Sequence, residues 1–228
     1  MAITLYKEKA PVRGVLFDVD GVILDTERLY SRFWMEACHF FGFPMTKEQS
    51  LQMRSLNKTA GQEKFHELFG PKADYTTIRL KRIELMDAFI EKEGAAAKPG
   101  ICTLLDALEA RGIPCAITSS SPRQRLECYL TPLNLYHRFQ KVVTGYDVPQ
   151  GKPEPDIYLR GAAELGLPPE GCLALEDSPA GILSAYRAGC LPVLIPDLDV
   201  PGEDTLSLLY ARADTLADVT VLLDDSGV

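Results

Sequence analysis

An apolar run ends in the stretch Phe17-Asp18-Val19-Asp20-Gly21-Val22-Ile23-Leu24-Asp25-Thr26. The run 12–17 predicts a β-strand, and Asp18 and Asp20, at positions i and i+2, then extend to the same side of the chain. Two carboxylates so close together repel each other and are costly to bury, and a divalent cation is the simplest compensation. The pair therefore indicates a metal site at the end of this strand, although D-x-D-G taken alone also fits an ordinary turn.

Further apolar runs rich in valine and isoleucine alternate with helical patterns from residue 100 onward. Strands are expected at 114–118, 141–144, 172–175 and 191–195. Between them, apolar residues in 101–108 follow the i, i+3, i+4, i+7 spacing of a helix with one buried face. Such alternation is typical of β-α-β units. The expected fold class is therefore α/β, with a doubly wound, Rossmann-like parallel sheet as its core.

Residues 26–96 follow a different pattern. They contain helical patterns interrupted by Gly42-Phe43-Pro44 and Gly70-Pro71, and Thr46 with Gln49 predicts a capping box at a helix start. A segment of small and rigid residues, 94–100, suits a hinge. We therefore expect a discontinuous catalytic core, residues 1–25 and 97–228, with an α-helical cap domain, 26–96, inserted after the first strand.

The charge balance narrows the possible partners. The chain has 228 residues, of which 32 are acidic and 24 basic, so the formal net charge is −8. Proteins that bind nucleic acid or anionic membranes usually carry a basic surface, so neither partner is expected. No apolar run approaches the about 18 residues of a membrane span, and the first residues lack the apolar segment of a secretory signal. We expect a cytoplasmic protein.

Hydroxyl groups follow the second predicted strand. Ser119 and Ser120 come directly after it, and Ser121, Pro122 and Gln124 together resemble an N-cap, a first helical residue and a capping-box partner. Backbone N–H groups at a helix start and neighbouring hydroxyls form an anion site that suits phosphate. An ordinary strand-to-helix turn would give the same local pattern.

A lysine and two more carboxylates follow the later strands. Lys152 lies between Gly151 and Pro153, and a lysine held in this way can direct its ammonium toward a phosphoryl group or toward carboxylates. Glu176 and Asp177 directly follow the strand 172–175, although Asp177 could also serve only as a helix cap. The carboxyl ends of parallel strands meet at one edge of a sheet, where ligands bind. Together these residue types predict a site for phosphoryl transfer with magnesium.

The chain resembles the haloacid dehalogenase superfamily, in the β-phosphoglucomutase-like branch that carries a helical cap and includes many sugar-phosphate and nucleotide phosphatases. The resemblance rests on four motifs in the order D-V-D-G-V-I-L-D-T, I-T-S-S-S, G-K-P-E-P-D-I-Y and L-E-D-S-P-A-G-I, and it spans essentially the whole chain. It implies that Asp18 is the nucleophile that forms an aspartyl-phosphate, and that Asp20 protonates the leaving oxygen and then activates water. Ser119, Ser120 and Lys152 would bind the transferring phosphoryl group.

The same resemblance implies a magnesium site. The ligands would be Asp18, the backbone carbonyl of Asp20, and Asp177, with Glu176 as a further ligand or a neighbour of one. Arg54 matches a cap position that contacts the far end of the substrate in relatives, and Asn57 and Lys58 lie nearby in the sequence. A solvated surface arginine is the alternative for Arg54.

The expected activity is magnesium-dependent hydrolysis of a small organic phosphomonoester, either a sugar phosphate or a nucleoside-derived phosphate. The segment L-D-T-E-R-L-Y resembles phosphatases that act on pseudouridine 5′-phosphate and on 2-deoxysugar phosphates. A phosphohexomutase is the first alternative, but Tyr30 and Pro122 stand where that group has histidine and lysine. A catalytically inactive phosphate-binding regulatory module is the second. The expected partner is a small phosphorylated metabolite, and the expected assembly is a monomer or weak dimer.

Overall fold

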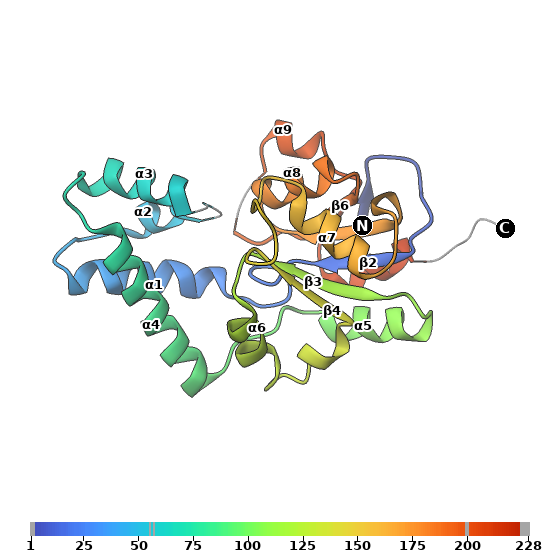
Figure 1. Ribbon diagram of the computed structural model, residues 1–228, viewed down its shortest axis with the longest axis horizontal. Coiled ribbons are helices and arrows are strands. Elements are labelled where there is room, and N and C mark those ends of the chain that lie inside the picture. Colours follow the sequence, from blue (N-terminus) through green and yellow to red (C-terminus); the bar gives the residue numbers. More distant parts are fainter. Residues whose placement is uncertain (1–2, 55, 57, 199–200, 224–228) are drawn as a thin grey trace. The chain divides into compact units, whose positions relative to one another are not determined.

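A computed structural model describes residues 3–54, 56, 58–198 and 201–223, without the side chain of Lys58. The chain divides into two compact units, one formed by Met1–Leu24 with Ala97–Val228 and the other by Asp25–Ala96 (Figure 1). The assignment of the first unit as a catalytic core and of the second as a cap stays a prediction. In the described part of the chain, no helix is long and apolar enough to cross a membrane.

The first unit is built on a mixed β-sheet. Within the described ranges this sheet has seven strands in the order β1-β7-β6-β5-β2-β3-β4. The strands are β1 (Ile3–Leu5), β2 (Gly14–Phe17), β3 (Cys115–Ser119), β4 (Lys141–Thr144), β5 (Cys172–Glu176), β6 (Leu191–Leu194) and β7 (Ala211–Ala213). The α/β fold class with a Rossmann-like sheet is confirmed, and so are the five predicted strands.

Two strands of the sheet were not predicted from the sequence. β1 pairs antiparallel with β7, so the sheet is not parallel throughout. Each of these strands has three residues, and β7 reads Ala-Arg-Ala, which is too short to show a period of two. β1 is also largely exposed, so it lacks the apolar character of the central strands.

Helices cover both faces of the sheet. They are α5 (Ile101–Ala110), α6 (Arg123–Leu130), α7 (Asp156–Glu164), α8 (Pro179–Arg187) and α9 (Glu203–Leu206), with 3-10 turns at Tyr136–Arg138, Pro169–Gly171 and Leu216–Leu222. In Figure 1, α7 and α8 lie on one side of the sheet and α5 lies on the other. Because both faces are covered, every residue of β2, β3 and β5 is buried, which explains their continuous apolar runs.

The central position of β2 determines where the strand ends converge. β2 lies between β3 and β5, and Phe17 is paired with Ile117 on one side and with Leu175 on the other. From β2 the chain proceeds to β3 and β4 in one direction and later to β5 and β6 in the other. The carboxyl ends of β2, β3 and β5 therefore surround the switch point at which open α/β sheets bind ligands.

The second unit is helical. It contains α1 (Glu27–Phe40), α2 (Lys47–Leu51), α3 (Lys58–Phe69) and α4 (Tyr75–Glu93). The rings of Trp34 and Tyr75 stack with their centroids 6.0 Å apart, and Phe65 packs against both at 5.9 Å and 5.6 Å. The predicted capping box is confirmed, since the Thr46 side chain accepts a hydrogen bond from the Gln49 N–H and the Gln49 side chain accepts one from the Thr46 N–H.

Candidate active site

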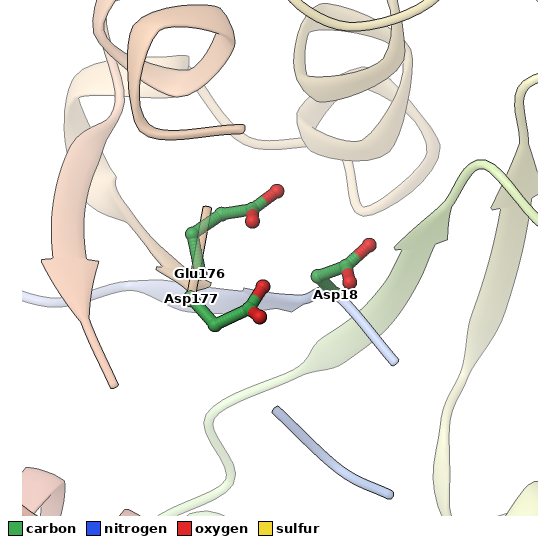
Figure 2. A group of neighbouring side chains, drawn as sticks. All are labelled: Asp18, Glu176 and Asp177. Atoms are coloured by element: carbon green, nitrogen blue, oxygen red, sulfur yellow. The ribbon is translucent and has the colours of Figure 1, made fainter. Parts of the chain in front are cut away.

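Three carboxylates come together at the carboxyl edge of the sheet. Asp18 follows β2, Glu176 ends β5 and Asp177 follows it, and each offers a ligand atom within 4.8 Å of those of the other two. Figure 2 shows the three side chains next to each other at the strand ends. The register accounts for this, because the Asp18 N–H donates to the Leu175 carbonyl at 3.0 Å and so continues the pairing of β2 with β5.

Lys152 joins two of these carboxylates. Its Nζ lies 2.6 Å from Asp18 Oδ1 and 2.5 Å from Glu176 Oε1, and it also donates to the Thr118 carbonyl at 3.1 Å. The lysine side chain is only 8% exposed. A buried ammonium with three acceptors is fully satisfied, so the structure places this lysine firmly against the predicted nucleophile.

Burial and charge shift the protonation of this group. Burial raises the pKa of Asp18 to about 7; Lys152 opposes the rise, whereas the charges of Glu176 and Asp20 add to it. Burial alone would lower the pKa of Lys152, but Asp18 and Glu176 outweigh that effect and hold the pKa above its usual value. The lysine therefore stays cationic, and any further cation bound here would favour the ionised form of Asp18.

Asp20 and the serines lie beside this group. The Ser121 hydroxyl donates to Asp20 Oδ2 at 3.0 Å, and the Ser121 N–H donates to Ser119 Oγ at 3.1 Å. Ser119 is buried, whereas Ser120 is exposed at the same edge. The structure thus brings Asp20 and both predicted phosphate-binding serines to the strand ends that carry Asp18.

The predicted capping role of Ser121 is wrong. Helix α6 begins at Arg123, with Pro122 as its N-cap and no side-chain hydrogen bond at the cap. The Ser121 hydroxyl donates to the carboxylate of Asp20 instead, and a charge-assisted hydrogen bond of this kind is stronger than one between neutral groups. Asp177 is not a helix cap either, because Ser178 caps α8 by accepting a hydrogen bond from the Gly181 N–H at 3.1 Å.

Two glycines leave room for the carboxylates. A Cβ added at Gly181 would lie 2.0 Å from the carboxyl carbon of Glu176, and one added at Gly21 would lie 2.2 Å from Asp177 Oδ2. Gly21 also has a φ of +80°, which disfavours any other residue. The space at each glycine is filled by a carboxylate of the group. An oxygen-only donor set of three carboxylates in such a cradle fits a hard cation such as Mg2+.

Tyr158 is a member of this site that sequence reasoning missed. Its hydroxyl lies 2.5 Å from Glu176 Oε1, the oxygen that also contacts Lys152. Burial, reinforced by nearby negative charge, holds the pKa of Tyr158 well above its ordinary value, so the hydroxyl keeps its proton and donates it. The sequence signal was the last residue of G-K-P-E-P-D-I-Y, where a tyrosine occupies the buried face of α7.

Arg54 belongs to the helical unit and forms an ion pair within it. Its Nε lies 3.3 Å from Glu27 Oε2, and the two side chains are 5% and 11% exposed. The alternative of a solvated surface arginine is therefore wrong. Asn57 and the side chain of Lys58 lie outside the described residues.

A parallel α/β core whose strand ends gather carboxylates, a buried lysine and serine hydroxyls defines an enzyme of the phosphoryl-transfer class. The family model described as haloacid dehalogenase-like hydrolase matches residues 15–195. The chain therefore belongs to the haloacid dehalogenase-like hydrolases, and it is a phosphatase of this family.

Individual relatives agree with this assignment. Over 218 residues the chain is 34% identical to hexitol phosphatase A of Escherichia coli K12, covering 94% of this chain and 96% of that protein. It is 31% identical over 216 residues to a protein of Drosophila melanogaster named probable pseudouridine-5′-phosphatase, covering 91% of each. The crystal structure of CbbY from Rhodobacter sphaeroides in complex with phosphate is similar with a TM-score of 0.77 and 25% identity, over 91% of this chain and 96% of that one.

Proposed function

We propose that this phosphatase is magnesium-dependent and hydrolyses a small organic phosphomonoester through an aspartyl-phosphate on Asp18. One observation carries the proposal: Asp18 contacts the buried ammonium of Lys152 and lies within the same group of ligand atoms as Glu176 and Asp177. A nucleophilic carboxylate that must approach an anionic phosphate needs this concentration of compensating charge.

The residues that would hold the magnesium ion are Asp18, Asp177 and Glu176, together with the backbone carbonyl of Asp20. The bound ion supplies positive charge that offsets the oxygens of the transferring phosphoryl group. Ser119, Ser120 and Lys152 would bind the same oxygens. The hydroxyl of Ser119 is buried at the end of β3, and the ammonium of Lys152 is buried in the segment between β4 and α7, which supports this role.

The proposed reaction has two steps. In the first, an oxygen of Asp18 forms a bond to phosphorus while the ester P–O bond breaks, and Asp20 gives its proton to the leaving alcohol oxygen. In the second, Asp20 takes a proton from water, the water oxygen bonds to phosphorus, and Asp18 is released with inorganic phosphate. The hydrogen bond from Ser121 orients the Asp20 carboxylate for both proton transfers.

We propose a phosphorylated sugar, sugar alcohol or nucleoside as the substrate. The names of the two curated relatives, a hexitol phosphatase and a probable pseudouridine-5′-phosphatase, support this range. Arg54 stays the predicted contact for the far end of the substrate. Tyr30 stands where the mutases have histidine, and the Arg82 guanidinium lies 4.5 Å from the centroid of its ring. We propose that the protein binds a small phosphorylated metabolite rather than nucleic acid and that it is located in the cytoplasm.

A panel of substrates tests this function. The purified protein is assayed with Mg2+ for phosphate release from phosphorylated sugars, sugar alcohols, nucleotides and pseudouridine 5′-phosphate, and also from p-nitrophenyl phosphate. We expect turnover of at least one small phosphomonoester, and none in the Asp18→Asn variant. Isomerisation of a hexose phosphate without phosphate release would favour the mutase. Phosphate binding without any turnover would favour the regulatory module.

A further inference from the structure

Tyr158 contacts the carboxylate group of the candidate site through Glu176. It belongs to α7, six residues after Lys152, and its side chain is fully buried. The hydroxyl donates to Glu176 Oε1 at 2.5 Å, and the ring centroid lies 5.2 Å from Lys152 Nζ. One short segment of the chain therefore supplies both the lysine and a hydroxyl that contacts the same carboxylate oxygen.

Glu176 is held by several donors at once. Its Oε1 accepts hydrogen bonds from Lys152 Nζ and from the Tyr158 hydroxyl, and its Oε2 accepts one from the Ser178 hydroxyl at 3.3 Å. The residue is 1% exposed, so water does not replace a lost donor easily. A buried carboxylate that loses a hydrogen bond either shifts toward another donor or stays underpaired, and both outcomes are costly.

The position of Lys152 depends on that carboxylate. Its three ammonium hydrogens have three acceptors, namely Asp18 Oδ1, Glu176 Oε1 and the Thr118 carbonyl. A change in the orientation of Glu176 would therefore move the ammonium relative to Asp18. It would also move one member of the predicted magnesium site. Both groups are therefore linked to Tyr158 through its contact with Glu176.

We propose that Tyr158 is a positioning residue of this phosphatase: through Glu176, its hydroxyl fixes Lys152 against Asp18 and fixes one carboxylate of the metal-binding group. The inference rests on the proposed function for the magnesium site. Phenylalanine has the same ring and lacks only the hydroxyl, so Tyr158→Phe removes this contact while the packing of α7 against the sheet is kept.

The test compares Tyr158→Phe with Tyr210→Phe. Tyr210 is also buried, but its hydroxyl accepts from the Ala10 N–H at 3.1 Å and does not contact the site residues described above. Three quantities are measured: kcat and KM for p-nitrophenyl phosphate or the best substrate of the panel, the Kd of Mg2+ by calorimetry without substrate, and the melting temperature. Loss of a partner that orients a metal ligand costs about 10- to 100-fold in metal affinity or activity.

We expect Tyr158→Phe to show such a loss in kcat and in Mg2+ affinity with little change in KM, and Tyr210→Phe to match the wild type. In a Glu176→Gln background, Tyr158→Phe should cost much less, because the hydroxyl acts through that carboxylate. Wild-type kcat and Mg2+ affinity in Tyr158→Phe would overturn the inference, and so would full additivity with Glu176→Gln. If the wild type hydrolyses no phosphomonoester, the proposed function fails, yet the Mg2+ titrations still decide the role of Tyr158.

Discussion

Phe17 lies opposite Leu175 in the parallel pairing of β2 with β5, and this register places Asp18 beside Glu176. The same strand pairs with β3 on its other side, where Phe17 lies opposite Ile117, so the Thr118 carbonyl is within reach of Lys152. Backbone hydrogen bonds in the centre of the sheet thus determine the spacing of the candidate catalytic groups. Variants of these groups should consequently change chemistry more than they change stability.

Replacing the predicted nucleophile should abolish turnover. In Asp18→Asn the side chain keeps its size but cannot form the aspartyl-phosphate, and Lys152 retains its contact with Glu176. We expect no phosphate release and a melting temperature close to that of the wild type. Asp204→Asn, an exposed carboxylate on α9, serves as the control and should be fully active. Wild-type turnover in Asp18→Asn would disprove the nucleophile assignment.

Replacing the predicted acid and base should slow the reaction according to the leaving group. For Asp20→Asn we expect a loss of about 100- to 10,000-fold with alkyl phosphates, the usual contribution of a general acid or base. With p-nitrophenyl phosphate the first step needs no proton, because nitrophenolate is a stable leaving group, so the loss in that step should be smaller. The kcat/KM values of the two substrates, which report the first step, are compared in wild type and variant. Equal losses in kcat/KM would argue against proton donation by Asp20.

Magnesium should stabilise the fold as well as support turnover. The metal-binding group holds three carboxylates, of which Asp18 and Glu176 contact the buried Lys152, so a bound cation relieves repulsion that exists in the native state only. A ligand that binds only the native state, at a concentration of about 100 times its Kd, raises the free energy of unfolding by about 2.7 kcal/mol. We expect a chelator to abolish activity and Mg2+ to raise the melting temperature, with the rise reduced in Asp177→Asn. A melting temperature that does not respond to Mg2+ would contradict this site.

A methyl group at Gly181 should disturb Glu176. Alanine in a helix is ordinarily better than glycine by about 0.5–1 kcal/mol, yet here its Cβ would lie 2.0 Å from the Glu176 carboxyl group. We therefore expect Gly181→Ala to be destabilised by about 1–3 kcal/mol, the usual cost of overpacking, and to lose activity as well. Denaturant unfolding and kcat are compared with those of Gly202→Ala, where nothing lies within 4 Å of the added Cβ. A stabilised and active Gly181→Ala would show that the carboxylate can move freely.

Two side chains that form an ion pair occupy backbone groups at the outer edge of β4. Arg123 Nη2 donates to the Val142 carbonyl at 2.6 Å, Asp147 Oδ2 accepts from the Thr144 N–H at 2.8 Å, and the two side chains lie 3.3 Å apart. In the described sheet β4 has a neighbouring strand on one side only, and unpaired edges promote association. We expect Arg123→Ala/Asp147→Ala to self-associate at rising concentration in light scattering. The control pair Arg32→Ala/Glu36→Ala, of similar exposure on α1, should stay unchanged.

Sequence reasoning succeeded where a local pattern carries the information. The central strands are continuous apolar runs, and polar residues directly after them belong to a common edge as a matter of topology, so Asp18, Ser119 and Glu176 could be placed together. Sequence reasoning failed for side-chain contacts between residues far apart in the sequence and for very short strands. The Ser121 hydroxyl donates to a residue 101 positions away, and Tyr158 donates to a carboxylate 18 positions on. Neither partner follows from spacing. Strands β1 and β7 were too short to show a period.

The position of β2 in the middle of the sheet also affects how the protein acquires its activity. Residues 14–17 lie between two neighbours in the sheet, 115–119 and 172–176, and both of these follow them in the sequence. During synthesis β2 therefore lacks both neighbours until residues 115–119 have emerged, and its second neighbour follows only with residues 172–176. Asp18 contacts a lysine that lies 134 residues later in the sequence. Such distant pairing slows folding. The three carboxylates of the candidate metal site can consequently come together only in a chain that has reached residue 177.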